Sequence, residues 1–421
     1  MSGNRHPEAA RRYHDATAHS PQSVRAGSRG LDWDTKPEPF KIYPELPVAT
    51  LPRDFPVPAL DALAAISTEP GGAAPLDLER LAALLFFSAG VTKRMAYPGG
   101  GTMYFRAAPS TGALYQTEVY VVAGDVAGLA AGVYHFSPGD FALRRLREGD
   151  FRGALAIAAA DDDLASRPAT LILSAIYWRN TWKYQARGYR HLFWDSGSML
   201  SNLLAAATAL DLPARAITGF VDLEVNGLLA LDAEKEGALL LAPVGGQGRP
   251  APVSPVIVAI TPAVNAYENS SLDAESEVQA WREASRERRS LAGALVALPT
   301  PRPSAGRALA ETIMARGSTR QFSGEAIGSG EFSTALWHAT RGWPADAPSG
   351  LVDLYLGVHA VDGIERGAYV YRPESHALEL IKRGDFRERA AFLCLEQSLG
   401  GMSSATVFFL AGLDALLEEF G

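Results

Sequence analysis

A turn-rich segment at residues 106–115, RAAPSTGALY, holds the first side chains of this 421-residue chain that could bind a polar ligand. Pro109 and Gly112 favour a tight backbone path there. On that path the hydroxyls of Ser110 and its neighbouring threonine, together with successive backbone amides, would be free for a ligand, and Arg106 would be available for negative charge. The same residue types also suit an ordinary loop with a helix-capping serine.

Lys183 and Tyr184 follow an apolar segment at residues 171–176 and could move a proton. Burial at the rim of a cleft lowers the pKa of a lysine, so that its amine can serve as a general base. A neighbouring phenol can relay a proton or orient a substrate. Because lysine–tyrosine pairs are also common on protein surfaces, this pair predicts a catalytic base only in combination with other features.

Two more sets of polar residues are candidates for ligand contacts. Asp195 and Asn202 lie seven residues apart, on one face of a predicted helix, where buried polar groups need partners that neighbouring backbone could also supply. Arg316, Ser318 and Arg320 place two guanidinium groups around hydroxyls and could clamp a phosphate. A solvated basic start to a helix is the competing interpretation of this second set.

Composition excludes several classes of function. The net charge is −8 and the 39 basic residues form no long run, so we expect no nucleic-acid partner. Cys394 is the single cysteine, which rules out an internal disulfide and suits a reducing cytoplasm. The histidines show no ligand spacing, so no metal site is predicted. No secretory signal and no apolar run of ~20 residues is present, so we expect a soluble cytoplasmic protein without membrane contacts.

The elements that must position these residues follow an α+β order. Apolar spacing predicts a helix at about 76–85, a strand at 118–123, a β-rich hairpin at 132–146, a strand at 169–176, a helix at about 190–210 and a strand at 238–244. Four parts are expected: an N-terminal arm (1–57), a first lobe (58–246), a linker (247–305) and a second lobe (306–421). We expect the arm to be extended and to contribute surface but no core, and the linker to carry a charged, exposed helix at 273–289.

The second lobe repeats the first. Tyr120, Gly132, Tyr134, Ala142, Leu143 and Gly149-Asp150-Phe151 recur as Tyr355, Gly367, Tyr369, Ala377, Leu378 and Gly384-Asp385-Phe386, at a constant offset. An unbroken offset over a whole hairpin is hard to obtain by chance. Because the chain ends soon after the predicted strand at 407–411, we expect a partial second lobe without a counterpart of the helix at 190–210.

Together these segments resemble the tandem nitroreductase-like dehydrogenases known as the SagB and cyanobactin-oxidase family. The resemblance covers most of residues 10–245. Its motifs are Tyr13-His14-x-x-Thr17-x-His19-Ser20, Arg106-x-x-Pro109-Ser110-x-Gly112-Ala113-Leu114-Tyr115-x-x-Glu118-x-Tyr120, Gly132-Val133-Tyr134-His135, Lys183-Tyr184, Gly188-Tyr189-Arg190 and Asp195. Arg316-x-Ser318-x-Arg320-x-Phe322 resembles the segment that opens ordinary nitroreductases. One departure is Gln116, where the family has a proline.

The resemblance implies a nitroreductase-like three-layer fold with FMN at the junction of two related lobes. The implied cofactor-binding residues are Arg106, Pro109, Ser110, Gly112, Ala113, Leu114, Asp195, Arg316, Ser318 and Arg320. Lys183 and Tyr184 are implied as the catalytic base element. The implied reaction is oxidation of thiazoline or oxazoline rings in a modified peptide to thiazole or oxazole.

Two other functions fit the same residues. A nitroreductase-like reductase of small molecules, fed by NAD(P)H, would use the same scaffold, because fold alone does not decide function. A flavin-free scaffold subunit of a peptide-modifying complex would follow from an incomplete second lobe. The expected partners are a peptide or small-molecule substrate, a cyclase of the same complex and a second copy of the chain in a homodimer that covers apolar surface of the short lobe.

Overall fold

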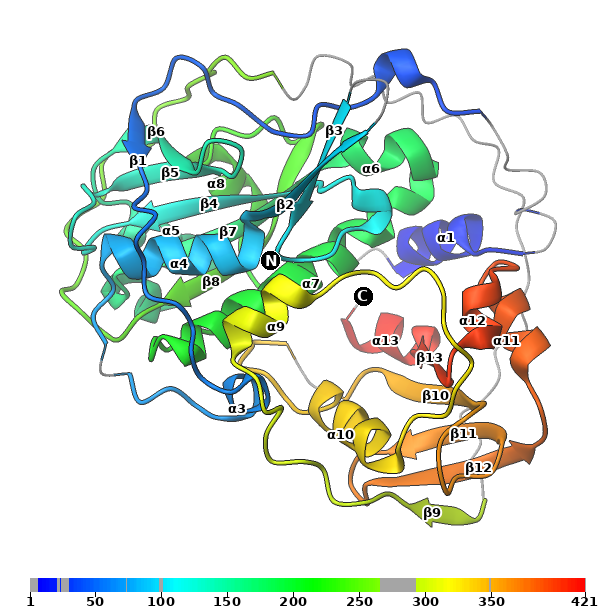
Figure 1. Cartoon of the computed structure of the whole chain (residues 1–421). Coiled ribbons are helices and arrows are strands. Elements are labelled where there is room, and N and C mark those ends of the chain that lie inside the picture. Colours follow the sequence, from blue (N-terminus) through cyan, green and yellow to red (C-terminus); the bar gives the residue numbers. More distant parts are fainter. Residues whose placement is uncertain are drawn as a thin grey trace.

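The computed structural model describes residues 7–20, 23, 30–72, 74–97, 101–265, 293–347 and 350–420, which form two lobes around two β-sheets (Figure 1). The strands of both sheets pair antiparallel with their neighbours, which confirms the predicted α+β class. The charged helix predicted at 273–289 lies outside the described residues.

The first lobe contains a six-stranded sheet in the order β1-β6-β5-β4-β7-β8. Its strands are β1 (Val48–Thr50), β4 (Thr117–Ala123), β5 (Gly132–Ser137), β6 (Ala142–Glu148), β7 (Ala169–Ile176) and β8 (Glu236–Val244). Each predicted strand of this lobe is present, with its ends shifted by no more than about two residues. β1 was not predicted, because its three residues are too few to show a period-2 pattern.

Helices cover both faces of this sheet and make the lobe three layers deep. Along β4, Val119 and Val121 face one apolar cluster while Tyr120 and Val122 face the other, as strand alternation requires. The first cluster contains α4 (Leu78–Ala89) and the long α7 (Gly188–Ala209). The second contains α5 (Arg152–Ala159), the 3-10 helix η3 (Asp162–Ser166) and α8 (Asp222–Leu228).

The second lobe reproduces this topology in a five-stranded sheet, in the order β13-β10-β11-β12-β9. Its strands are β9 (Leu295–Ala297), β10 (Asp353–Val358), β11 (Gly367–Arg372), β12 (Ala377–Arg383) and β13 (Ala405–Leu410). Even the β-bulge recurs: the register shift at Val133/Tyr134 in β5 has its counterpart at Ala368/Tyr369 in β11. The sequence repeat is therefore a structural repeat, and β9 takes the place of β1.

The helices of the second lobe follow the same plan and add one helix that was not predicted. Besides α9 (Leu309–Ala315) at its start, they are α10 (Ser329–Ala339), α11 (Arg387–Leu393), α12 (Ser398–Met402) and α13 (Leu413–Phe420). α13 follows β13 as α6 (Tyr177–Tyr184) follows β7, so the repeat continues one helix beyond the predicted last strand. Among the described residues of this lobe, no element corresponds to α7 or β8.

The lobes meet along two short helices, α3 (Ala62–Ser67) and α9 (Leu309–Ala315), which lie side by side in Figure 1. Asp61 and Ala308, just before these helices, form an antiparallel bridge. The Asp61 carboxylate also accepts hydrogen bonds from the backbone amides of Ala305 and Gly306. Because α9 packs into the core beside α7, the start of the second lobe is fixed against the first lobe.

The N-terminal arm contributes to the core, contrary to the prediction. It begins with α1 (Pro7–Thr17), which contacts α13 and the segment between α6 and α7, and continues through the 3-10 helix η1 (Trp33–Thr35) to β1. Tyr43 is 1% exposed, and Lys41 is completely buried. The polar and proline-rich composition concealed this burial, because Lys41 is buried with partners from elements distant in the sequence.

Candidate functional site

The loop between β3 (Gly101–Arg106) and β4 has an unusual backbone. A 3-10 turn, η2 (Thr111–Ala113), sits within it, and Gly112, Ala113 and Tyr115 all adopt left-handed φ angles of 67°, 56° and 51°. Left-handed non-glycine residues cost of order 1–3 kcal/mol each and persist where surrounding contacts impose them. We call residues 106–115 the Ser110 loop, and its strained backbone indicates a functional conformation.

Asp195 on α7 holds the Ser110 loop in place. Its carboxylate accepts hydrogen bonds from the Ser110 hydroxyl (2.6 Å), from the Thr111 amide (2.8 Å) and from the Thr111 hydroxyl (2.8 Å). The expectation that the two hydroxyls are free for a ligand is therefore corrected, because both donate to this carboxylate. Asp195 was predicted to bind the cofactor, and its contacts within the described residues are those that order the loop.

Gln116, the departure from the family motif, completes this arrangement. Its side-chain amide donates to Asp195 (2.7 Å) and to the backbone carbonyl of His191 (3.1 Å). Its carbonyl accepts from Asn180, which also bonds the His191 ring at 2.7 Å. Burial, with help from nearby arginines, lowers the pKa of His191 to about 4, so the ring is neutral at physiological pH. A proline at position 116 would provide none of these side-chain hydrogen bonds.

Tyr184 lies against the Ser110 loop, as Gly112 shows. A Cβ added at Gly112 would meet the Tyr184 hydroxyl at 2.8 Å, so glycine is needed there for space as well as for its backbone angle. The Tyr184 ring also packs edge-on to the His191 ring at 4.7 Å. Burial, with a smaller contribution from Asp195, raises the pKa of Tyr184, so the phenol keeps its proton at neutral pH.

Lys183 is at the predicted place but in a different environment. Its side chain is exposed, so the burial that the sequence-based hypothesis required is not found among the described residues. The ammonium lies 5.4 Å from the centre of the Tyr184 ring, within reach of a cation–π contact. Tyr184 therefore lies against the Ser110 loop with Lys183 beside its ring, and the catalytic role of both residues stays a prediction.

Arg106 is not available to an anionic ligand in this structure. Only 2% of the residue is exposed, and its guanidinium donates to the backbone carbonyls of Thr117 (3.3 Å) and Pro39 (3.2 Å). Burial lowers its pKa to about 10, which still leaves it charged. Arg106 thus ties the N-terminal arm to the Ser110 loop, a role that is different from the predicted one.

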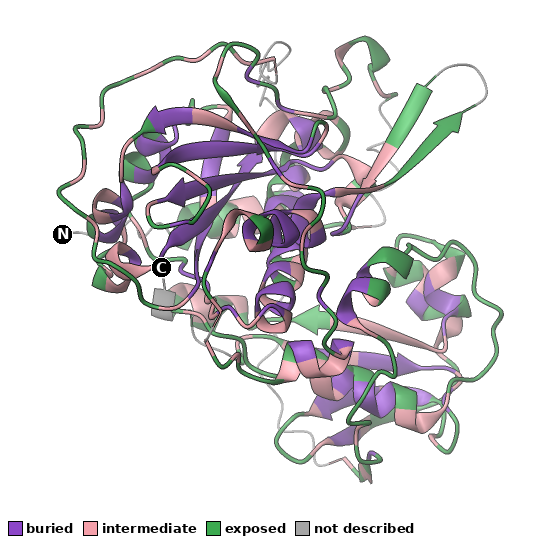
Figure 2. Cartoon of the chain, turned by 60° about the vertical axis from the view of Figure 1, so that its left-hand side comes forward, coloured by how far each residue is buried: buried purple, intermediate pink, exposed green. Residues whose placement is uncertain are grey.

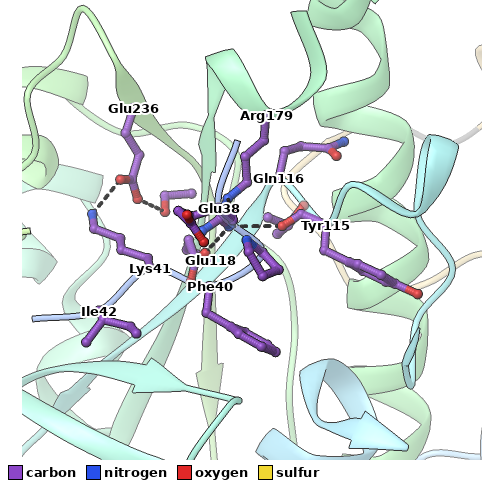
Figure 3. A network of polar contacts seen from close by, with 12 residues as sticks. Glu38, Phe40, Lys41, Ile42, Tyr115, Gln116, Glu118, Arg179 and Glu236 are labelled. Atoms are coloured by element: carbon purple, nitrogen blue, oxygen red, sulfur yellow. Dashed lines mark hydrogen bonds and ion pairs between the residues drawn. The ribbon is translucent and has the colours of Figure 1, made fainter. Parts of the chain in front are cut away.

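A buried ion pair beneath the Ser110 loop strengthens this connection (Figure 3). Arg179 pairs with Glu118 and also donates to the backbone carbonyls of Tyr115 and Glu38, at 3.1 Å each. Burial favours a neutral Glu118, but Arg179 and the hydrogen bond from His135 outweigh it and lower the pKa of this carboxyl. Glu118 belongs to the motif of the resemblance, whereas Arg179 was not predicted, because nothing in the sequence shows that its helix meets the strand of Glu118.

The Arg316 segment of the second lobe reaches the Ser110 loop. After α9 ends, Arg316 donates long hydrogen bonds to the backbone carbonyls of Arg106 (3.5 Å) and Ala107 (3.4 Å). Ser318 and Arg320 follow in an exposed, non-helical stretch. The interpretation of these residues as a helix start does not hold, since the helix lies before them. The structure thus brings Arg316 to the loop, while Asn202, on α7, has no contact with it that the structure records.

The donors at this junction fit a ligand with one anionic end and one planar polar end. Arg316 and Arg320 are exposed cations that could hold a phosphate. Within the Ser110 loop the amides of Thr111, Ala113, Leu114 and Tyr115 already donate to the described chain. The amides of Ser110 and Gly112 could bind a polar ring edge or an oxyanion. Within the described residues, no group of three or more His, Cys, Asp or Glu side chains could hold a metal ion. No described helix is long and apolar enough to cross a bilayer.

Comparison with known proteins assigns the class. A family model described as "Nitroreductase family" matches residues 73–246, which include the Ser110 loop, α6 and α7. Over 172 residues the chain is 35% identical to "Putative nitroreductase MJ1384" of Methanocaldococcus jannaschii, covering 81% of that protein and 41% of this chain. The chain belongs to the nitroreductase family.

Two further relatives are named for the processing of peptides. The chain is 28% identical over 139 residues to the microcin B17-processing protein McbC of Escherichia coli, and 29% identical over 171 residues to the trifolitoxin-processing protein TfxB of Rhizobium leguminosarum. It spans about half the length of each, 51% and 46%, and these matches cover 32% and 39% of this chain.

A solved structure is similar over nearly the whole chain. It is a nitroreductase-like protein from Anabaena variabilis, with 27% identity and a TM-score of 0.74, and the similarity covers 97% of this chain and 86% of that one. Both lobes and their junction thus have a counterpart in one known structure, which confirms the predicted nitroreductase-like fold.

Proposed function

We propose that this chain is an FMN-dependent oxidoreductase of the SagB and cyanobactin-oxidase type, which oxidises thiazoline or oxazoline rings in a modified peptide. Two observations support the proposal. The relatives McbC and TfxB are named for processing the peptides microcin B17 and trifolitoxin. The observation that carries it is the Ser110 loop, which Asp195 clamps from one lobe and Arg316 contacts from the other.

In this proposal the two lobes share the cofactor. Arg316, Ser318 and Arg320 would hold the FMN phosphate, and the backbone of Pro109 to Leu114 would contact the flavin ring. Bound there, FMN would supply a two-electron acceptor for hydride. Arg106 and Asp195 would act through the loop rather than on the cofactor, because their side chains are occupied by backbone carbonyls and loop donors respectively.

Azoline oxidation removes one hydride and one proton and leaves a new ring double bond. FMN, when bound, would accept the hydride, and the proton needs a base at the ring. We assign the base to the amine of Lys183, which is exposed and therefore accessible to a bulky peptide. Tyr184, protonated because its pKa is raised, would donate a hydrogen bond that orients the substrate.

An absorption spectrum of the purified protein is the first test, followed by release and identification of the flavin. The second test incubates the protein with a thiazoline-containing peptide in air and measures the loss of two hydrogens by mass spectrometry. Lys183→Met should retain flavin while slowing oxidation by roughly 10²-fold or more. The exposed Lys382→Met is the matched control. A protein that neither contains nor binds FMN would exclude the proposal and favour a scaffold subunit.

A second candidate function is reduction of small electrophiles by NAD(P)H, favoured by the 35% identity to the nitroreductase-named relative from Methanocaldococcus jannaschii. Anaerobic addition of NADPH distinguishes the two. Rapid bleaching of the flavin by NADPH, without oxidation of the azoline peptide, would support the reductase. Bleaching by the azoline peptide alone would support the dehydrogenase.

The proposed reaction also requires an enzyme that makes the azoline, so a cyclase is the partner we propose. Co-purification with a cyclase encoded nearby would test that contact. A homodimer is the other proposed assembly, and light scattering of the purified chain measures it.

A further inference from the structure

A small cavity with three cationic side chains lies at the base of the β2–β3 hairpin, where β2 (Val91–Tyr97) pairs with β3. Its volume is about 180 Å³. Arg53 comes from the N-terminal arm, and Lys93 and Arg94 come from β2, while Phe86 and Phe141 supply apolar walls. The hairpin itself projects from the first lobe and is largely exposed (Figure 2).

The charge of this cavity is not compensated by the part of the chain that the structure describes. No carboxylate lines the cavity, and none of the ion pairs among the described residues includes Arg53, Lys93 or Arg94. Three like charges on one small surface repel one another unless an anion lies between them. In a chain of net charge −8, this local excess of positive charge indicates an anionic ligand.

Local structure holds these cations in position. The β2–β3 pairing shifts register between Val91 and Lys93, and a bulge of this kind redirects side chains. Arg53 stacks on the Phe141 ring, with 5.3 Å between guanidinium and ring centre, and Arg94 stacks on Tyr104 at 5.7 Å. Stacking leaves the N–H donors of a guanidinium free in its plane for an oxyanion.

A continuous row of rings and cations connects the cavity with the Ser110 loop. From Arg94 the row continues through Tyr104 to Phe40, whose rings lie 4.9 Å apart. Arg106 then lies 5.7 Å from the Phe40 ring and 5.3 Å from the Tyr115 ring of the loop. The cavity is thus connected to the candidate site by contacts among side chains of the first lobe and the arm.

The size of the cavity limits what it can hold. Pockets that enclose a whole small molecule measure about 300–1,000 Å³, so this one would hold a single charged group of a larger ligand. Beside it, the hairpin pairs with neither main sheet and leaves strand edges on which an extended peptide can lie.

We propose that this cavity is an anchor for an acidic side chain of the peptide substrate, placed at a distance from the ring that reacts. The proposal rests on the proposed function for its peptide. It assigns Arg53, Lys93 and Arg94 to substrate binding, with no part in the chemistry.

The test measures binding to the full-length, flavin-loaded protein by fluorescence anisotropy. One probe is a labelled glycine–serine decapeptide with two adjacent glutamates, and the other carries glutamines instead. The glutamate peptide should bind about three- to tenfold more tightly, and the preference should weaken as salt is raised. K93Q/R94Q should remove the preference, and K382Q/R389Q, which changes two exposed cations of the second lobe, should keep it.

The double variant could disrupt the hairpin, so a third variant, R53Q, changes a cation outside it. R53Q should reduce the preference for the glutamate peptide in the same way. Equal binding of both peptides to the unaltered protein would overturn the proposal. So would a loss of NADPH affinity in K93Q/R94Q without change in peptide binding, which would assign the cavity to a nucleotide phosphate. Since binding is measured and not turnover, a protein that binds the peptide but lacks dehydrogenase activity would contradict the proposed function alone.

Discussion

Asp195 accepts a hydrogen bond of 2.6 Å from the hydroxyl of Ser110, which lies 85 positions earlier in the chain. The same carboxylate also accepts hydrogen bonds from the Thr111 amide and from the Gln116 side chain. One buried acid on α7 therefore fixes the shape of a loop whose backbone would be strained without support. The loop that is proposed to contact the flavin depends on a residue that need not touch the flavin.

Asp195→Asn should loosen the loop without changing the size of the side chain. Hydrogen bonds to a charged acceptor contribute about 1.5–3 kcal/mol each, and asparagine can satisfy only part of the set. We expect a loss of about 2 kcal/mol in the free energy of unfolding and a roughly tenfold weaker FMN affinity, measured by denaturation and by flavin fluorescence. Asp162→Asn, at an exposed position, is the control. Unchanged FMN affinity in D195N would contradict the clamp.

Gly112→Ala should be harmful for two separable reasons. The added Cβ would lie 2.8 Å from the Tyr184 hydroxyl, and alanine disfavours the left-handed backbone at this position. Tyr184→Phe removes the hydroxyl and so relieves the closest contact. We therefore expect the double variant to bind FMN better than G112A alone, with the remaining cost of roughly 1 kcal/mol coming from the backbone. Strictly additive effects in this double-mutant cycle would show that the two residues do not interact.

Lys41→Met should destabilise the first lobe strongly. Lys41 and Glu236 are both fully buried and pair at 2.5 Å, and this partner raises the pKa of Lys41 despite the opposing effect of burial. Removing one partner of such a pair costs about 3–5 kcal/mol, because the other charge stays buried. K41M/E236Q should recover part of this loss in chemical denaturation. A change below about 1 kcal/mol in K41M would mean that the arm is not part of the core.

Stability should fall as pH is lowered through the range between about 6.5 and 4. The folded state lowers the pKa of His191 from 6.5 to about 4, so in this range the unfolded chain binds the extra proton and gains stability relative to the folded one. Burial also lowers the pKa of His135 and contributes in the same direction. His191→Gln should therefore show a shallower loss of unfolding free energy between pH 7 and pH 5 than the unaltered protein. Identical slopes would remove His191 from this explanation.

Much of the fold could be predicted because its signals are local. The strand Ala169–Ile176 was predicted with the bounds observed, because it is a continuous apolar run, and α7 was predicted within two residues from its apolar spacing. The constant offset of the repeat predicted the second sheet. The helix α13 was not predicted, because it is short and amphipathic and follows its strand closely.

The candidate site was only partly predictable. Residue type and spacing were enough to select the turn-forming residues of the Ser110 loop, Lys183-Tyr184 and Arg316. The structure brings Tyr184 and Arg316 to the loop. Gln116 was noticed only as a departure from a motif. Arg179 was not noticed, because its partners Glu38, Tyr115 and Glu118 come from segments far from it in the sequence.

The sequence by itself determined the order of helices and strands, the repeat and the backbone turn around Gly112, since each depends on residues close together in the chain. Only the tertiary structure decided which polar groups are free and which are engaged. In the fold, the side chains of Arg106 and Asp195 are buried, and Lys41 is buried in a pair with Glu236. The side chain of Lys183 is exposed to solvent. The physical reason is that burying a charge is favourable only with a partner in place, and that partner is supplied by the fold and not by neighbours in the sequence.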